Sequence, residues 1–199
     1  MLRDLADRRP SPGSPRAADA PDMALVGRVA AGDLQAFEAL YRAYQPRLSR
    51  FIGLMTSRRT VVEEVLNDTM LVVWRRSDTY NRQCKVSTWI FAIAYRTALK
   101  ALRHQDDPAD APPADARASD ELGPEQQRCD RETRAALARA LDALSAEQRS
   151  VLVLTYFHDL PYAEIAQIVD CPIDTVKTRM FHGRRRLRAL LSGELGDWL

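Results

Sequence analysis

Apolar side chains recur every three to four residues over most of the chain, which is the spacing of an amphipathic helix. The pattern is clear in residues 25–44, which include Leu25, Val29 and Phe37, and again in residues 61–74. No segment shows a convincing alternation of apolar and polar residues that would indicate a strand. The pattern therefore predicts an all-α protein.

Capping residues and prolines mark where these helices begin. Asp33 precedes the apolar run that contains Phe37 and is a typical N-cap residue. Ser145-Ala-Glu-Gln148 matches the capping box, in which two side chains satisfy the first N–H groups of a helix. Pro161 suits the first position of a helix, where its missing N–H does no harm.

The C-terminal part of the chain has the pattern of a helix-turn-helix. A short helix from Pro161 breaks at Asp170-Cys171-Pro172, because proline disfavours helical geometry in the residue before it. A second helix begins near Ile173, and one apolar stripe runs along it: Val176, Met180, Gly183, Leu187 and Leu191. Its other face is basic, which predicts a helix that lies in the major groove of DNA. The simpler alternative is a basic helix that only faces water.

We expect the polar and aromatic side chains around this second helix to divide by their reach. Those near its start are candidates for contacts with base edges: Lys177, Thr178, Phe181 and His182. Others are better placed for phosphates, which supply affinity and register but little sequence information: Arg149, Thr175, Arg184 and Arg185.

Proline and charge divide the chain into four segments. Residues 1–24 and 105–130 hold eight of the eleven prolines and no aromatic side chain, so they cannot bury enough apolar surface to fold. The net charge is +7 over residues 25–104 and −6 over 105–130, so the overall charge of +2 hides two opposed blocks. We expect a disordered tail, a helical domain, a flexible acidic linker and a second small helical domain over 1–24, 25–104, 105–130 and 131–199.

Several classes of protein are excluded by what the sequence lacks. It has no Gly-rich phosphate loop, no CxxC or HExxH motif and only three widely spaced histidines, so we expect neither an enzyme nor a bound metal or cofactor. No apolar run approaches the roughly 20 residues of a membrane span. The three cysteines form no disulfide framework, which suits a cytoplasmic protein. Cys171 is expected to be a small buried residue, with a redox role as the alternative, and a start at Met23 instead of Met1 stays open.

Two groups of motifs resemble the sigma factors of bacterial RNA polymerase. Region 4 of these proteins resembles Ala143-Leu-Ser-Ala-Glu-Gln-Arg149, Tyr162-Ala-Glu-Ile-Ala166 and Thr175-Val-Lys-Thr-Arg179. Region 2 resembles Glu63-Glu-Val-Leu-Asn-Asp-Thr-Met-Leu-Val-Val-Trp74 and Ser87-Thr-Trp-Ile-Phe-Ala-Ile-Ala94. Two helical domains in this order, joined by a short linker with no domain between them, are similar to the extracytoplasmic-function (ECF) group.

The resemblance implies a subunit that binds core RNA polymerase, directs it to a promoter and helps to open the DNA. In this family region 2 docks on a coiled coil of the largest polymerase subunit, and region 4 contacts the polymerase flap. The docking residues it implies are Glu64, Asn67, Asp68 and Met70, although Met70 is equally well explained by the core, where Trp74 and Trp89 are also expected. Family members are commonly held inactive by an anti-sigma protein.

Region 2 of these proteins also holds a flipped base of the minus-ten element and follows the displaced strand. Unstacked bases bind to a basic surface with aromatic and polar pockets. The resemblance implies this role for Tyr80, Asn81, Arg82, Gln83, Lys85, Arg96, Lys100 and Arg103. The family commonly has Asn in place of Arg96 and Arg in place of His182, so its base preferences do not transfer.

The alternative hypothesis is a helix-turn-helix activator or repressor whose N-terminal domain senses a ligand or forms a dimer. A helix-turn-helix alone does not separate the two. The basic, Trp-containing block that resembles region 2 favours the sigma factor, because a ligand-sensing domain does not need it.

Overall fold

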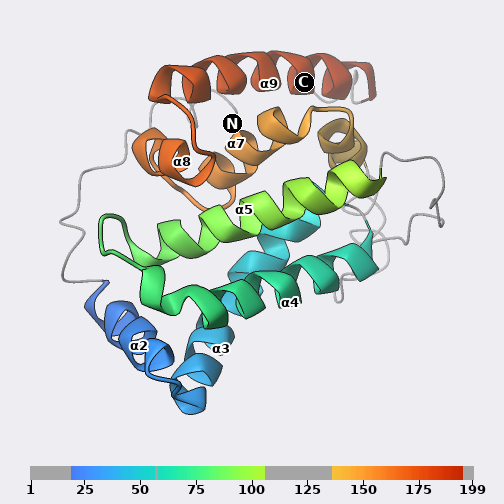
Figure 1. Cartoon of the computed structure of the whole chain (residues 1–199). Coiled ribbons are helices and arrows are strands. Elements are labelled where there is room, and N and C mark those ends of the chain that lie inside the picture. Colours follow the sequence, from blue (N-terminus) through green and yellow to red (C-terminus); the bar gives the residue numbers. More distant parts are fainter. Residues whose placement is uncertain (1–18, 57, 106–135, 195–199) are drawn as a thin grey trace, which may run out of the picture.

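The computed structural model describes residues 19–56, 58–105 and 136–194, and Figure 1 shows their arrangement. The N-terminal half contains α2 (Ala20–Ala30), α3 (Leu34–Met55), α4 (Arg59–Arg76), the short 3-10 helix η1 (Ser77–Thr79) and α5 (Val86–Gln105). The C-terminal half contains a helical segment over residues 136–142, then α7 (Ala146–Tyr156), α8 (Tyr162–Ile168) and α9 (Ile173–Glu194). All regular elements in the described ranges are helices, as the apolar spacing predicts.

Two of the predicted helix caps are present. Asp33 Oδ1 accepts hydrogen bonds from the backbone N–H groups of Gln35 and Ala36 at 2.9 and 3.1 Å, which satisfies the first turn of α3. Ser145 Oγ accepts a hydrogen bond from the backbone N–H of Gln148 at 3.3 Å at the start of α7. Both caps lie where the sequence places them, because capping depends on neighbours along the chain.

The turn between α8 and α9 confirms the predicted break. Asp170 has a φ of 50°, the left-handed conformation that commonly ends a helix, and Cys171 N donates to Ala166 O at 3.1 Å. The sequence predicts Pro161 at the first helical position, whereas the structure places it at the N-cap, one residue before α8 begins at Tyr162. α9 begins at Ile173, as expected.

The tail predicted over residues 1–24 is wrong at its C-terminal end, because α2 begins at Ala20. Pro21 lies in the first turn, where proline favours a helix, so its presence in a proline-rich stretch is misleading there. Val26 and Val29 are buried, and Tyr44 OH donates to Asp22 Oδ2, which holds α2 against α3. Residues 1–18 lie outside the described residues.

Helices α3, α4 and α5 form the core of the N-terminal half, and α2 packs against α3 and η1. Phe51 of α3, Val73 of α4 and Phe91 of α5 are fully buried. Trp74 and Trp89 are partly buried and pack against this core, as predicted, with ring centroids 5.1 Å from Phe37 and 5.4 Å from Tyr80 respectively. This packing leaves one face of α4 and of α5 open to solvent.

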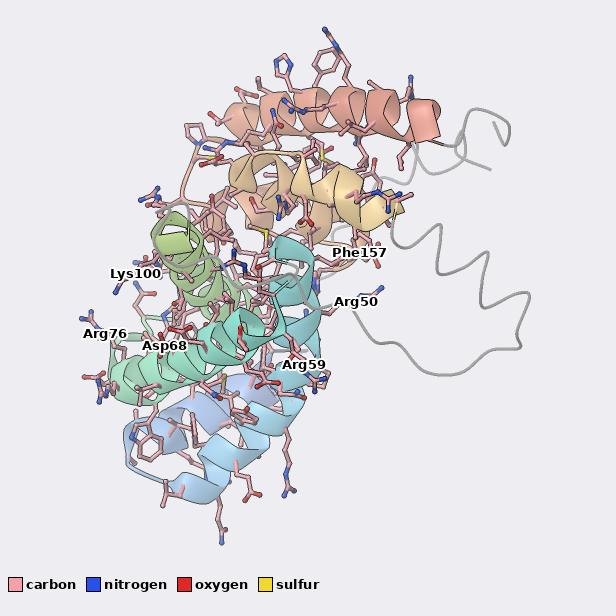
Figure 2. All side chains as sticks on the ribbon, turned by 90° about the vertical axis from the view of Figure 1, so that its right-hand side faces the viewer. Arg50, Arg59, Asp68, Arg76, Lys100 and Phe157 are labelled. Atoms are coloured by element: carbon pink, nitrogen blue, oxygen red, sulfur yellow. The ribbon has the colours of Figure 1, made fainter. Side chains whose placement is uncertain are left out.

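The two halves contact each other directly. α7 lies against α3 and α8 against α5, so the buried side chains form one continuous cluster (Figure 1). At this junction the guanidinium of Arg50 lies 5.3 Å from the centre of the Phe157 ring (Figure 2), and the His158 ring packs on Phe51 and Phe91. Apart from Gln105, which ends α5, the predicted linker lies outside the described residues.

Candidate nucleic-acid and polymerase interface

The predicted apolar stripe fixes the orientation of α9. Val176 and Met180 are buried, and a Cβ added at Gly183 would lie 3.0 Å from Leu152 Cδ1 of α7. Glycine therefore allows α9 and α7 to approach closely. The opposite face of α9 is turned to solvent, at the top of the molecule in Figure 1.

The exposed face of α9 carries the four side chains predicted to contact base edges. Phe181 is 63% exposed although it is large and apolar, and its ring lies edge-on to His182 at a centroid distance of 5.4 Å. Lys177 Nζ pairs with Asp174 at 2.8 Å, and Thr178 Oγ1 donates to the carbonyl of Asp174 at 2.9 Å. The structure therefore brings the four candidates together on the first turns of one helix.

The predicted phosphate contacts are less uniform. Arg185 is exposed and Thr175 is half-buried. Arg184 is exposed, but its Nη2 donates to Tyr162 OH at 3.0 Å and its guanidinium lies 5.6 Å from the centre of the Tyr156 ring. Arg184 thus also ties α9 to α7 and α8.

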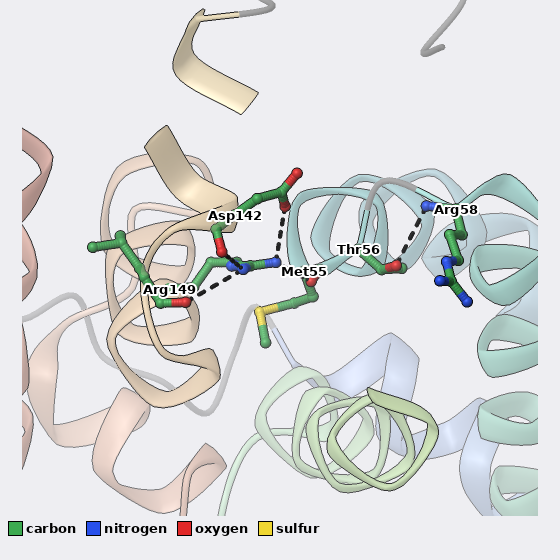
Figure 3. Close-up of polar contacts among 6 residues, drawn as sticks. Met55, Thr56, Arg58, Asp142 and Arg149 are labelled. Atoms are coloured by element: carbon green, nitrogen blue, oxygen red, sulfur yellow. Dashed lines mark hydrogen bonds and ion pairs between the residues drawn. The ribbon is translucent and has the colours of Figure 1, made fainter. Parts of the chain in front are cut away.

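The phosphate contact predicted for Arg149 is wrong for this arrangement of the chain (Figure 3). Arg149 is only 8% exposed, and its Nη1 donates to the carbonyl of Met55 at 2.5 Å and to Asp142 Oδ1 at 3.1 Å. Its Nη2 donates to the carbonyls of Asp142 and Leu144 at 2.8 and 3.3 Å. A guanidinium is retained in the interior when acceptors surround it in this way. Because Met55 ends α3, Arg149 links the two halves of the protein instead of facing DNA.

The loop that joins η1 to α5, which we number 80–86 so that it includes Val86, the first residue of α5, presents three of its predicted strand-binding residues to solvent: Asn81, Arg82 and Gln83. Tyr80 is half-buried, and its hydroxyl donates to the carbonyl of Cys84 at 2.6 Å. Burial, with a smaller contribution from the charge of Asp19, raises the pKa of Tyr80 to about 12, so the hydroxyl keeps its proton. Tyr80 therefore holds the loop from its inner side.

Lys85 is engaged by the other half of the protein. Its ammonium group pairs with Glu164 Oε1 of α8, and Thr88 Oγ1 donates to Glu164 Oε2 at 3.4 Å. Lys85 is half-buried in this contact. In this arrangement its ammonium group is therefore paired with α8.

An open groove of about 530 Å³ runs between α4 and α5. Four cationic residues line it, two from each helix: Arg75, Arg76, Arg96 and Lys100. Figure 2 shows Arg76 and Lys100 projecting on the same side of the molecule, and Trp89 adds an aromatic ring to the lining. A second hollow of about 540 Å³ continues along α5 to Arg103. Clustered cations beside an aromatic ring are what a single nucleic-acid strand requires.

The outer face of α4 carries three exposed polar residues of the predicted polymerase-binding set: Glu64, Asn67 and Asp68. Met70 does not belong to this face. It is 2% exposed and packs in the core with Leu66 and Val73, so its predicted docking contact is wrong. The helical period explains the result, because Met70 lies four positions after Leu66 and three before Val73, and both of these side chains are buried.

Leu71 is the residue of α4 that sequence reasoning missed. It is 43% exposed, and it lies three and four positions after Asp68 and Asn67, on the same outer face. The helical period, applied to the sequence alone, could have placed Leu71 on the outer face of α4 and Met70 in the core.

Within the described residues, no helix is long and apolar enough to cross a membrane, and no group of His, Cys, Asp and Glu side chains could hold a metal ion. Cys171 is half-buried, and its Sγ accepts a hydrogen bond from Arg179 Nη1 at 3.7 Å.

Two sequence models of one protein family match the chain. The model described as Sigma-70 region 2 matches residues 40–107, and the model described as Sigma-70, region 4 matches residues 134–187. Together they cover more than half of the chain. The first match lies mostly in the N-terminal half, where it begins within α3, and the second covers most of the C-terminal half.

Curated relatives match along most of their length. The ECF RNA polymerase sigma-E factor of Salmonella typhi is 27% identical over 176 residues, which cover 83% of this chain and 92% of the relative. The sigma-E factor of Haemophilus influenzae is 27% identical over 178 residues, with 83% and 93% covered.

Solved structures of the same fold include CnrH in complex with the cytosolic domain of CnrY, with a TM-score of 0.67 and 22% identity, covering 87% of this chain and 98% of that chain. Another is the sigma factor RpoE in complex with the anti-sigma factor NepR from Bartonella quintana, with a TM-score of 0.64, 24% identity, and 80% and 98% covered. The motifs, the two matched regions and the shared fold agree: the chain belongs to the sigma-70 family of transcription initiation factors, in its ECF group.

Proposed function

We propose that this sigma factor uses three surfaces to start transcription. The outer face of α4 binds core RNA polymerase, the groove between α4 and α5 with the loop 80–86 binds the melted minus-ten strand, and the outer face of α9 binds the minus-thirty-five duplex. The first two surfaces meet at Asp68 and Leu71, which also line the groove. The presence of a basic groove and of an exposed basic helix in one chain is the observation that most strongly supports this division.

The groove supports strand binding through its charge and shape. Arg75, Arg96 and Lys100 provide cations along a path that a phosphate backbone can follow, and the loop offers amide and guanidinium groups to unstacked bases. The hydroxyl of Tyr80 is occupied by the carbonyl of Cys84, so Tyr80 contributes by holding the loop.

The outer face of α9 supports duplex binding through its side-chain chemistry. Lys177 can donate to guanine acceptors, and Phe181 can contact a thymine methyl group. Arg184 and Arg185 lie further along the helix, where they meet phosphates. Region 4 also contacts the flap of the polymerase in this proposal, as the family resemblance implies.

An anti-sigma protein is the proposed regulatory partner. Two solved structures with this fold hold a second protein, the cytosolic domain of CnrY or the anti-sigma factor NepR. The extended outer faces of α4 and α9 give such a protein two surfaces to cover, and covering either would block transcription.

The experiment that tests the proposal is reconstituted transcription. The purified chain is added to core RNA polymerase, co-purification is measured, and run-off transcripts are sequenced from a library of genomic fragments. We expect a stable complex and transcripts that start at a small set of promoters with two shared upstream elements.

The regulator hypothesis makes a different prediction in the same assay. A helix-turn-helix activator or repressor would change transcription only when another sigma factor is also present. A chain that neither binds core polymerase nor makes it start at a promoter would contradict the proposed function.

A further inference from the structure

The residue that precedes α5 cannot cap this helix with its own side chain. Trp89 N donates to the carbonyl of Lys85 at 3.0 Å, which makes Lys85 the N-cap residue of the helix that begins at Val86. A lysine side chain has no acceptor for the first N–H groups of a helix. Asp19, far away in sequence, supplies one: its Oδ2 accepts a hydrogen bond from Val86 N at 3.0 Å.

Asp19 is available for this contact because its side chain does not cap the helix that it precedes. Its backbone is helical, with φ −93° and ψ −6°, and its side chain makes no capping hydrogen bond to α2. Its carbonyl accepts from Met23 N at 3.0 Å, and α2 is anchored by the contact between Asp22 and Tyr44. The carboxylate of Asp19 is therefore held by one packed helix and directed at the start of another.

The charge of the same carboxylate also acts on two residues of the loop 80–86. Burial first, and the charge of Asp19 next, raise the pKa values of both Tyr80 and Cys84. Tyr80 and Cys84 are joined by a hydrogen bond across the inner side of the loop. The charge of Asp19 is thus felt at the hydrogen bond between Tyr80 and Cys84, whereas residues 81–83 are exposed to solvent.

The loop needs such support, because its backbone is strained. Arg82 has a φ of 61°, a conformation that a residue with a side chain rarely adopts. Strain of this kind persists only when surrounding contacts hold the segment in place. The hydrogen bonds to Cys84 O and from Val86 N provide two such contacts, one on each side of Lys85.

We propose that Asp19 is a positioning residue for promoter recognition: by capping α5 from α2, it fixes the loop 80–86 so that residues 81–83 meet a flipped base in one geometry. This inference rests on the proposed role of the loop in binding the minus-ten strand. Asp19 itself touches no base. A carboxylate at the start of α5 also interacts favourably with the helix dipole, which strengthens the cap.

The test compares Asp19→Ala with Asp19→Asn and Asp33→Ala in the full chain. Asn keeps an oxygen that can accept from Val86 N. Asp33→Ala is the matched control, because it removes another N-cap carboxylate at the opposite end of α2, where it serves α3. Thermal unfolding of each variant shows whether the two alanine variants lose comparable stability.

Two quantities are measured. The first is hydrogen exchange of the backbone amides of residues 86–89. The second is base discrimination by the holoenzyme, taken as the ratio of its affinities for two oligonucleotides. One carries the minus-ten sequence of a promoter used by the wild type in run-off transcription, and the other has its flipped base replaced.

For Asp19→Ala we expect exchange at Val86 to become about fivefold faster, the factor that corresponds to a typical capping bond. Discrimination falls by a similar factor, while Asp19→Asn stays near the wild type and Asp33→Ala changes neither quantity. The proposal is overturned if Asp19→Ala leaves discrimination unchanged, or if Asp33→Ala lowers it as much. A wild-type holoenzyme that shows no base preference would instead contradict the proposed function, and exchange at Val86 would still report whether Asp19 caps α5.

Discussion

The two basic surfaces of this sigma factor are built in different ways. The outer face of α9 is a property of one helix, because every side chain on it follows from a single register. The groove between α4 and α5 is assembled from these two helices and Thr79 of η1, which come together only when the N-terminal half folds. A local face depends on its own sequence, whereas an assembled surface depends on residues elsewhere in the chain. A single substitution on the outer face of α9 should therefore remove a single DNA contact. Strand binding by the groove should also be weakened by substitutions at residues that hold the groove in place.

The largest effect is expected when a buried residue of α4 is truncated, in comparison with an exposed residue of the same helix. Met70→Ala opens a cavity in the core and should lower the free energy of unfolding by about 2–5 kcal/mol. Leu71→Ala should change it by less than about 0.5 kcal/mol but weaken binding to core polymerase, because Leu71 lies on the outer face. Urea unfolding and pull-down of core polymerase check the pair. If Leu71→Ala unfolds the protein and Met70→Ala only weakens polymerase binding, the assignment of the two faces is reversed.

Sequence preference on the duplex should depend on single contacts from α9. Lys177→Ala and Phe181→Ala should each cost about 1–3 kcal/mol of discrimination between the minus-thirty-five element and altered sequences. Arg185→Ala should leave discrimination intact and weaken binding to all sequences alike. Competition footprinting with the holoenzyme measures directly the ratio of its affinities for the minus-thirty-five element and for the altered sequences. A loss of discrimination in Arg185→Ala alone would contradict the division between base and phosphate contacts.

The junction between the halves should make stability depend on pH through His158. Burial, helped by Arg47 and Arg50, lowers its pKa to about 4, while its ordinary value is 6.5. Between these values the unfolded chain binds a proton that the folded chain does not, so stability falls as pH drops from about 6.5 to about 4. We expect a loss of about 1–2 kcal/mol, reduced by the partial exposure of the ring. Urea unfolding at several pH values should show that the free energy of unfolding depends less on pH in His158→Phe than in the wild type. An unchanged pH dependence would show that His158 does not cause it.

The smallest effect should separate the two basic surfaces by salt. Lys100→Ala should reduce the salt dependence of binding to a single-stranded minus-ten oligonucleotide by about 0.7 in the logarithmic slope. Arg185→Ala should reduce the slope for duplex binding by about 0.9 and leave single-strand binding unchanged. Fluorescence titrations over a range of salt concentrations give both slopes. Equal effects of the two variants on both ligands would mean that the surfaces are not distinct.

The features that sequence reasoning predicts correctly are local ones. Asp33 and Ser145 cap helices whose first N–H groups are two or three residues away, and the stripe from Val176 to Gly183 follows from the helical period. The same information places the outer face of α9 correctly.

The features that it misses depend on distant neighbours. Arg149 is buried because the carbonyl of Met55 faces it across the junction of the halves. Asp19 acts at Val86, and no pattern within residues 1–24 indicates that contact. Met70 is a different case, because its family resemblance conflicts with its place in the helical period, and the period is right.

The central claim is that α9 and the groove between α4 and α5 meet different parts of one promoter. Site-specific photo-crosslinking of the holoenzyme tests it most directly, with a photoreactive residue placed at position 181 or at position 100. We expect the probe at 181 to react with the minus-thirty-five duplex and the probe at 100 to react with the melted strand near the minus-ten element. Crosslinks from both positions to the same element, or from neither position to promoter DNA, would contradict it.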